Sequence, residues 1–342
     1  MNLIELHILQ SFPVSCLNRD DVGSPKSALF GGVRRARVSS QCLKRACRVL
    51  AREDHPGFQG IRSRHLVEPF TAALVDAGVA ETDAADKATE ICSLFSKQDG
   101  KHPEQVTTAV YLSPGEIRQI SEAIAAGEEP KKAIKNASRL DAADISLFGR
   151  MVANDATLNV DGAAMFSHAL STHRADNEVD FFSAVDDRKS EAEDAGAGMI
   201  GTLEFNSATY YRYVAINLDM LADAKHLGGL TPEERNDILR AFIKAAMLSV
   251  PGARKNSMNA GTLPHEVLGI RKTSGQPLQL VNAFESPVKG NGQGFAAASL
   301  HEMKQHLEAI EKTWGEQGTK HWLTGTAGGL DGFLDNLLNP NS

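Results

Sequence analysis

The sequence is short of the features that mark membrane and secreted proteins. None of its apolar runs approaches the roughly 18 residues that are needed to span a bilayer. The N-terminal stretch MNLIELHILQSF lacks the basic segment of a secretory signal and instead alternates like a strand. We therefore expect a cytoplasmic protein that makes no membrane contact.

Cysteines and common catalytic motifs are also scarce. The four cysteines form no CxxC pair, which favours reduced structural thiols over a metal or redox site. GxxxxGK[ST], HExxH and GxSxG are all missing from the sequence. His168 and His173 are five residues apart in a strand-like run, so they lie on opposite faces and do not bind one ion without a bulge. We expect no metal, no cofactor and no catalytic residue.

Positive charge is concentrated in one segment of an acidic chain. The whole chain carries a formal net charge of −7, whereas Asn18 to Arg52 contains nine Lys or Arg against two acids, a net of +7. These cations are Arg19, Lys26, Arg34, Arg35, Arg37, Lys44, Arg45, Arg48 and Arg52. Such a confined excess is typical of a protein that binds a polyanion at one place, so the sequence predicts nucleic-acid binding. The alternative interpretation is a solvated basic helix face.

The residues after Ser39 predict an amphipathic helix. Ser39 or Ser40 can cap it, and its apolar side follows helical spacing through Leu43, Ala46, Cys47 and Leu50. The cations recur on the other side of the same helix, where they would form a basic ridge that begins at free backbone N–H groups.

The remaining pattern predicts an α+β fold. Ile4, Leu6 and Ile8 alternate with polar residues, which indicates a half-buried first strand. The segments DISLFGRM, GAAMFSHAL and ATYYRYVAINL are predicted strands, and Thr231 and Glu234 form a capping box for a helix that ends near Leu248. The order strand, helix, strand, strand, helix, strand is that of a ferredoxin-like or RNA-recognition-motif (RRM) core. Residues from about 58 to 143 interrupt this order with several predicted helices, with breaks near Gly100 to Pro103, Pro114 and Pro130.

Several blocks of the sequence resemble one family. SCLNRDD (Ser15 to Asp21), Lys26 and FGGVRRARVSSQCLKRA (Phe30 to Ala46) are similar to the N-terminus of the CasC family, the backbone subunit of the type I-E CRISPR Cascade complex. The likeness continues in family order through FGRM, VDGAAMFSHALSTH, DFFSAVDD, YYRYVAINL, VPGARKNS and NAFE. The blocks span most of the chain.

The resemblance implies a domain organisation and a set of RNA contacts. It implies an RRM-like palm at residues 1–57 and 144–342, helical fingers at 58–143 and a thumb extension at 174–205. The implied guide-RNA (crRNA) contacts are Arg19, Lys26, Ser39, Gln41, Lys44, Arg45, Arg48 and Met151. Without the resemblance, a Met in a strand-like run is more often part of a core. Lys131, Lys132 and Lys135 are implied to face target DNA.

The polar segment from Arg174 to Gly201 separates two strand-like runs and should protrude. Composition alone is consistent with a disordered surface loop. The resemblance implies instead a thumb that reaches a neighbouring copy and displaces a guide nucleotide, with Phe181, Phe182 and Ser183 at the contact. Phe181 stands where one similar member of the family has Trp, which reduces the surface that is available for stacking.

Two functions remain open at this point. The first is a non-catalytic backbone subunit, several copies of which polymerise along crRNA and present it to target DNA. Its further implied partners are the large, small, crRNA-processing and guide-5′-end-capping subunits of Cascade and a recruited helicase-nuclease. The alternative is a metal-dependent endoribonuclease that uses Asp20 or Asp21, since backbone subunits of related type III complexes cut RNA with a loop aspartate. In a basic loop, however, acids more often orient arginines.

Overall fold

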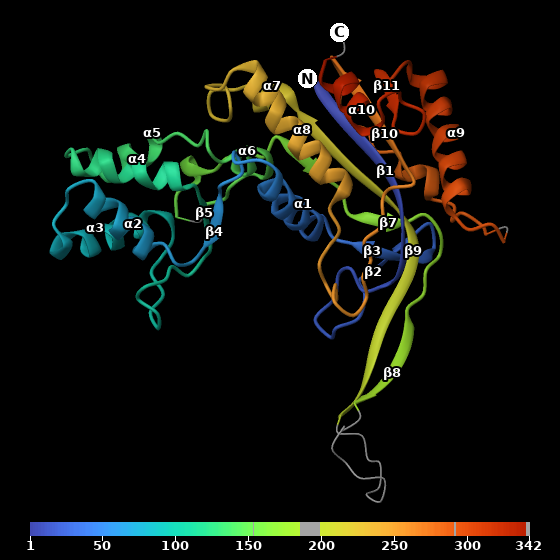
Figure 1. Cartoon of the computed structure of the whole chain (residues 1–342), viewed down its shortest axis with the longest axis horizontal. Coiled ribbons are helices and arrows are strands. Elements are labelled where there is room, and N and C mark those ends of the chain that lie inside the picture. Colours follow the sequence, from blue (N-terminus) through green and yellow to red (C-terminus); the bar gives the residue numbers. More distant parts are fainter. Residues whose placement is uncertain (153, 185–198, 291, 340–342) are drawn as a thin grey trace, which may run out of the picture. The chain divides into compact units, whose positions relative to one another are not determined.

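A computed structural model describes residues 1–152, 154–184, 199–290 and 292–339 of the chain (Figure 1). The chain divides into two compact units, which are described separately. The helical unit consists of Met1–Leu3, Arg48–Met165 and Ile216–Lys244. The sheet unit consists of Ile4–Cys47, Phe166–Ala215 and Ala245–Ser342.

One large sheet forms the centre of the sheet unit. Its strand order is β11-β10-β1-β9-β7-β3-β2, with β6 and β8 paired to β9 off this path. The strands are β1 (Leu3–Ser15), β2 (Ser27–Phe30), β3 (Val33–Val38), β6 (Ala164–Phe166), β7 (Ala169–Ser171), β8 (Glu178–Ala184), β9 (Met199–Asn217), β10 (Glu266–Lys272) and β11 (Thr319–Trp322). The pairs β2–β3, β3–β7, β7–β9, β8–β9 and β10–β11 are antiparallel. An antiparallel sheet with helices in separate segments is an α+β fold, as predicted.

Helices follow the strands in both units. They are α1 (Ser40–Asp54), α8 (Pro232–Leu248), α9 (Ala296–Trp314), α10 (Gly329–Leu338) and the short η2 (Val281–Phe284). The predicted capping box of α8 is confirmed: the Thr231 N–H donates to Glu234 Oε2 at 2.8 Å, and the Glu234 N–H donates to Thr231 Oγ1 at 3.2 Å. No described helix is both long and apolar enough to cross a membrane.

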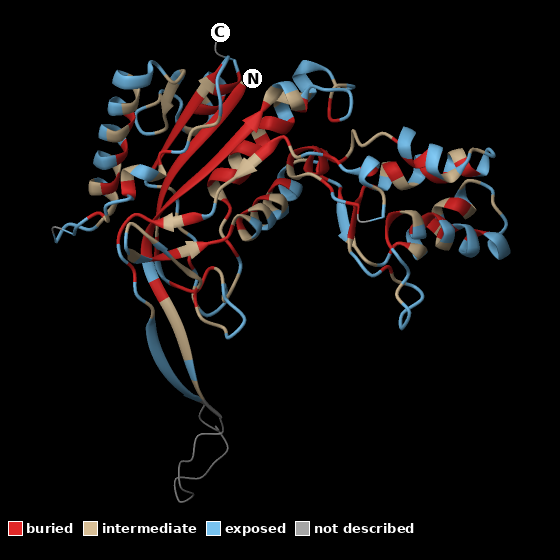
Figure 2. Cartoon of the chain, turned by 180° about the vertical axis from the view of Figure 1, so that it is seen from behind, coloured by how far each residue is buried: buried red, intermediate tan, exposed pale blue. Residues whose placement is uncertain are grey.

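The first strand is buried on both faces, so the prediction of a half-buried strand is wrong. Glu5 and His7 are fully buried among the central strands, which Figure 2 shows in red. Glu5 pairs with Lys272 at 2.7 Å and accepts a hydrogen bond from the Tyr213 hydroxyl at 2.7 Å. His7 Nδ1 lies 2.8 Å from the Tyr211 hydroxyl. Distant strands supply these polar partners, and alternation within one strand does not reveal them.

The helical unit contains the helices that were predicted between residues 58 and 143. They are α2 (Val67–Asp76), α3 (Glu81–Phe95), α4 (Pro114–Ala125) and α5 (Pro130–Asn136), accompanied by β4 (Ile61–Ser63) and β5 (Val110–Leu112). Their shared core includes Phe70 and Phe95, whose rings stack at 6.2 Å. Pro114 and Pro130 each begin a helix, which suits a residue without an N–H. The unit also contains α6 (Ala143–Phe148), η1 (Ala156–Leu158) and α7 (Leu218–Leu221).

The segment DISLFGRM is not a strand. It forms α6, which ends where Gly149 adopts a φ of 83°, and only Arg150 makes a β-bridge, to Val160. The Asp144 carboxylate fixes the helix because it accepts hydrogen bonds from the Gly60 N–H at 3.1 Å and the Tyr111 hydroxyl at 2.6 Å. A short apolar run fits a helix or a strand equally well, and here tertiary contacts decide.

The strands β8 and β9 form a hairpin that extends beyond the rest of the sheet in the sheet unit (Figure 1). Their register pairs Glu178 with Phe205 and Ala184 with Met199. The part of the predicted thumb at residues 185–198 lies outside the described residues.

Candidate nucleic-acid interface

A tight turn presents the first predicted contact, Arg19. The Asp20 carboxylate Oδ1 accepts the N–H groups of Val22 at 3.0 Å and Ser24 at 2.9 Å, and Gly23 adopts a φ of 94°. Arg19 is exposed at the start of this turn and forms a β-bridge with Pro25. Asp20 therefore shapes the loop that carries Arg19, which is the role that the sequence favoured for this acid.

Asn18 connects this loop to the other basic elements of the sheet unit. Its side-chain oxygen accepts the Ser39 N–H at 2.9 Å, and its carbonyl accepts the Lys26 N–H at 2.8 Å. The Lys26 carbonyl in turn accepts the Arg37 N–H at 2.9 Å. Arg19, Lys26 and the start of α1 are thus held in one local framework. Sequence reasoning gave Asn18 no role, because a single Asn carries no distinctive pattern.

The first turn of α1 is capped from two directions. The Ser39 hydroxyl accepts the Cys42 N–H at 3.3 Å, and His168 Nδ1 accepts the Ser40 N–H at 3.1 Å. Burial, with help from Arg37 and Lys26, lowers the pKa of His168, which keeps the accepting nitrogen free of a proton. Ser39 is buried and occupied as a cap, so its predicted RNA contact stays a prediction. The interpretation of His168 as a hydrogen-bonding histidine is confirmed.

The polar face of α1 carries the other predicted contacts. Gln41 and Arg45 are exposed, whereas Lys44 is half-buried with its Nζ 5.8 Å from the centre of the Phe166 ring. Burial lowers the pKa of Lys44. Arg48, one turn further along α1, belongs to the helical unit, where its guanidinium lies 5.2 Å from the centre of the Tyr111 ring. These rings position two cations without neutralising them.

Arg35 does not belong to the surface that its neighbours form. Its side chain is fully buried, and its guanidinium donates to the backbone carbonyls of Phe30, Ser171, Phe284 and Glu285 at 2.7 to 3.2 Å. The sequence analysis counted Arg35 among the nine candidate cations, and this is wrong: its buried side chain does not contribute to an exposed basic surface. It instead ties β3 to β7 and to the NAFE segment.

Met151 follows a buried ion pair in the helical unit. Arg150 contacts both carboxylate oxygens of Glu116, at 2.7 and 2.9 Å. Met151 itself is 77% exposed, so the interpretation of this Met as part of a core is wrong.

The lysines Lys131, Lys132 and Lys135 are exposed on α5 in the helical unit. Lys132 pairs with Glu128 at 3.3 Å, whereas Lys131 and Lys135 line a cavity of about 270 Å³ together with Asp155. Hydrogen bonds from Thr157 lower the pKa of Asp155, and both lysines add to this effect.

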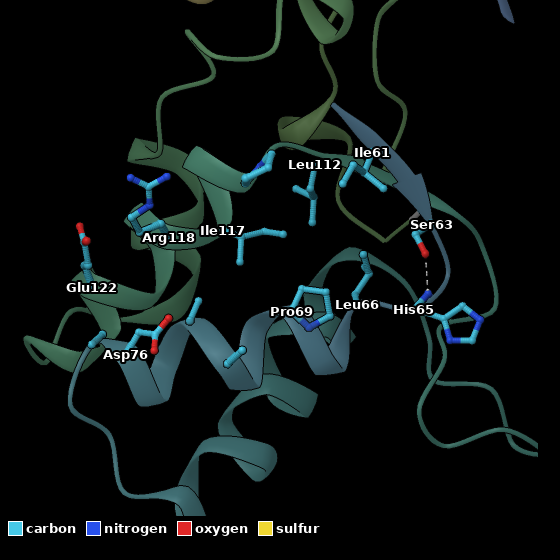
Figure 3. A pocket seen from close by; sticks show the side chains of 14 residues that line it. Ile61, Ser63, His65, Leu66, Pro69, Asp76, Leu112, Ile117, Arg118 and Glu122 are labelled. Atoms are coloured by element: carbon cyan, nitrogen blue, oxygen red, sulfur yellow. Dashed lines mark hydrogen bonds between the residues drawn. The ribbon is translucent and has the colours of Figure 1, made fainter. Parts of the chain in front are cut away.

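An apolar groove of the helical unit lies between α2, α4 and the β4–β5 pair (Figure 3). Its floor includes Leu66, Leu112 and Ile117. Such a floor suits apolar side chains and not phosphate, so this groove is outside the candidate interface.

On the hairpin, Phe181, Phe182 and Ser183 are exposed on β8. The exposed fractions are 65% for Phe181 and 39% for Phe182. Large exposed aromatic side chains on a protruding hairpin suit a contact with another molecule.

A loop of the block VPGARKNS also lies beside the basic framework. Val250 and Ala260, at the two ends of this loop, pack in the apolar cluster that contains Leu17 and Leu43. Burial raises the pKa of the Cys16 thiol, and the charges of Arg254 and Arg19 oppose this rise. Arg254 has a φ of 52°, the only positive value among the described non-glycine residues. The sequence predicted no role for this block, because the residue type Arg does not reveal an unusual backbone conformation.

Among the described residues, no cluster of three or more His, Cys, Asp or Glu side chains is arranged to hold a metal ion.

Comparison with known proteins identifies the family. The model of the CT1975-like protein family matches residues 4–333, so the chain belongs to this family. One similar solved structure is titled "CRISPR RNA-guided surveillance complex, pre-nicking": it is 27% identical, with a TM-score of 0.77, and the match covers 92% of this chain and 90% of that one. Another, titled "CRISPR RNA-guided surveillance complex", is 26% identical with a TM-score of 0.60, over 94% and 88% of the two chains. A search of curated proteins finds no match. The resemblance to the CasC family is confirmed.

Proposed function

We propose that this protein is a non-catalytic backbone subunit of a CRISPR type I-E Cascade surveillance complex. Several copies polymerise along crRNA, hold its backbone and present its bases for pairing with target DNA. Family membership and the similar surveillance-complex structures support the backbone role. The titles of those structures describe RNA-guided complexes, which is why a guide RNA is the proposed ligand.

The observation that carries the proposal is the unneutralised charge of the basic segment. Among the described residues, no carboxylate forms a salt bridge with any cation from Arg19 to Arg48. Exposed Arg19 and Arg45 and half-buried Lys26 and Lys44 therefore retain their charge around the Asn18 framework. Phosphates of a single strand would neutralise them, and backbone contacts of this kind carry no sequence information.

Strand order supports the proposed RRM-like palm. Four neighbouring strands of the sheet have the order β10-β1-β9-β7. In the sequence, α1 lies between β1 and β7, and α8 lies between β9 and β10. This arrangement is typical of a ferredoxin-like core, in which the last strand lies beside the first. We propose the palm at 1–57 and 144–342, with the helices of 58–143 as fingers and 174–205 as the thumb. The exposed hairpin is suited to reach a neighbouring copy through Phe181 and Phe182.

The proposed contacts follow from these positions. Arg19, Lys26, Gln41, Lys44, Arg45 and Arg48 would hold phosphates, Ser39 would present the helix N-terminus, and exposed Met151 would pack against a base. Lys131, Lys132 and Lys135 would face target DNA. Within a type I-E complex, the other partners would be the large, small, crRNA-processing and guide-end-capping subunits and the recruited helicase-nuclease.

The test is RNA binding measured at several salt concentrations. The purified protein should carry RNA, seen as a raised 260/280 nm absorbance ratio and identified by sequencing. Lys44→Ala and Arg45→Ala should weaken the binding of two unrelated guides equally and lower the slope of log affinity against log salt by about 0.7 each. Lys312→Ala, on α9, is the control for the loss of one charge. A variant that binds one guide normally and the other poorly would show base reading and contradict the proposed backbone contact.

A further inference from the structure

The loop 251–259 of the sheet unit follows α8 and lies against the same core as the basic loop and α1 (Figure 1). Val250 and Ala260, at its two ends, pack in the cluster that contains Leu17, Val38 and Leu43. Leu17 precedes Asn18, Val38 precedes the cap Ser39, and Leu43 lies in α1. The ends of the loop therefore pack in the same apolar cluster as residues of the basic loop and α1, which carry the candidate RNA-binding surface.

Arg254 occupies a strained position in this loop. Its φ of 52° is in the left-handed region, which side chains with a Cβ adopt only at an energetic cost. The turn is closed because the Arg254 carbonyl accepts the N–H groups of Ser257 at 3.1 Å and Met258 at 2.8 Å. Neither hydrogen bond uses the side chain, so a glycine would form this turn with less strain. Strain that persists in spite of an available relief is common at functional sites.

The Arg254 guanidinium lacks a partner within the part of the chain that the structure describes. Its Nε is buried without a hydrogen-bond acceptor, and no described carboxylate forms a salt bridge with it. Asp20 and Glu204 are the acids that act on the Cys16 thiol. Asp20 Oδ1 accepts the N–H groups of Val22 and Ser24, and Glu204 Oε2 accepts the side-chain N–H of Asn177 at 3.0 Å. A guanidinium with a buried unsatisfied donor and no described carboxylate partner, in a loop that shares an apolar cluster with the basic loop and α1, calls for an anion.

We propose that Arg254 is a further guide-RNA-binding residue, whose unpartnered guanidinium binds a phosphodiester next to the surface that the basic loop and α1 form. The next residue, Lys255, is a second, exposed cation of the same loop. The inference rests on the proposed function, because it adds a residue to the same RNA-binding surface.

Three variants separate the charge of Arg254 from its backbone strain, and two further variants serve as references. Arg254→Gly removes both, Arg254→Ala removes the charge and keeps the strain, and Arg254→Lys keeps both but loses the planar fork. Lys312→Ala is the matched control for the loss of one charge. Lys44→Ala reports on the proposed function independently, since Lys44 is on α1.

We expect Arg254→Gly and Arg254→Ala to bind guide RNA roughly five- to tenfold more weakly, with a salt slope lower by about 0.7. Arg254→Lys should retain the slope and lose part of the affinity. Arg254→Gly should unfold at a higher temperature than Arg254→Ala, and no lower than the unchanged protein. This combination of weaker binding with retained stability is not expected of a structural arginine.

Each other result is decisive. If both charge-removing variants bind normally while Lys44→Ala binds weakly, the inference is wrong and the proposed function stands. If Lys44→Ala also binds normally, the proposed function fails. If only Arg254→Ala is weakened, backbone strain and not the cation controls binding, which overturns the inference. Destabilisation by Arg254→Gly would show a structural role.

Discussion

The contrast between Arg35 and Arg45 gives the sharpest test of how the structure divides the basic segment. The Arg35 guanidinium donates to the carbonyls of Phe30, Ser171, Phe284 and Glu285 and is fully buried. Arg35→Met keeps most of the length of the side chain and removes every donor. Arg45→Met makes the same change at an exposed position on α1.

The expected cost of Arg35→Met follows from its hydrogen bonds. A hydrogen bond with a charged partner contributes about 1.5–3 kcal/mol, and carbonyls that keep other partners recover part of the loss. We therefore expect the free energy of unfolding to fall by about 3–5 kcal/mol, as for the removal of a buried charged partner. The loss is a third or more of the stability of many domains. Arg45→Met should change the stability by less than about 0.5 kcal/mol.

Urea unfolding followed by circular dichroism measures the change in stability, and RNA binding at several salt concentrations measures the loss of a phosphate contact. Arg35→Met should lower the urea midpoint. Under conditions in which this variant is folded, its RNA binding should keep the salt slope of the unchanged protein. Arg45→Met should keep the midpoint and lower the slope by about 0.7. If Arg35→Met unfolded at the original midpoint while it lowered the slope, Arg35 would be a binding residue and the reasoning would be refuted.

Three further predictions concern assembly, catalysis and pH. Replacing Asp180–Leu203 by an Asn-Gly turn between the paired Val179 and Glu204 should leave thermal unfolding nearly unchanged. The same change should abolish multimers on guide RNA in size-exclusion chromatography. Complexes of equal size would show that the hairpin has no role in assembly. The assembled complex should not cut complementary RNA in Mg²⁺ or Mn²⁺, and cleavage lost in Asp21→Ala would establish the nuclease alternative. Burial and Lys272 lower the pKa of His7 from 6.5 to about 3, so the unfolded chain takes up a proton near pH 6.5 that the folded chain refuses. Stability should thus fall by about 2–3 kcal/mol between pH 6.5 and 4.5, and parallel stability curves for His7→Gln and the unchanged protein would contradict this.

Local signals in the sequence predicted the helices best. Ser39 caps α1, and the Thr231–Glu234 capping box begins α8, because both signals depend on residues within one turn. The contacts of Glu5 and His7 could not be predicted, since their partners Tyr213 and Tyr211 are more than 200 residues away in sequence. The same limit applies to α6, whose Asp144 is fixed by Gly60 and Tyr111.

For the candidate site, the sequence predicted which residue types gather but not what each one contacts. Arg34 and Arg35 are neighbours in β3 and point to opposite faces, yet only the structure shows that the face of Arg35 is covered. Arg254 has no sequence signal at all, because its distinguishing features are a backbone angle and a missing partner.

Among the described residues, the cations from Arg19 to Arg48 lack the carboxylate partners that two arginines of the helical unit have, and this difference supports the proposed place of RNA binding. In the helical unit, Arg52 pairs with Asp144 at 3.5 Å, and Arg150 pairs with Glu116 at 2.7 Å. In the basic segment of the sheet unit, a carbonyl oxygen orients one cation instead: Arg37 donates to the Ser27 carbonyl at 3.3 Å. A carbonyl fixes the direction of a cation without cancelling its charge, whereas a carboxylate does both. A cation whose direction is fixed by a carbonyl, as for Arg37, or by a ring, as for Lys44 and Arg48, stays positive and can bind a phosphate with less loss of side-chain entropy than a free side chain.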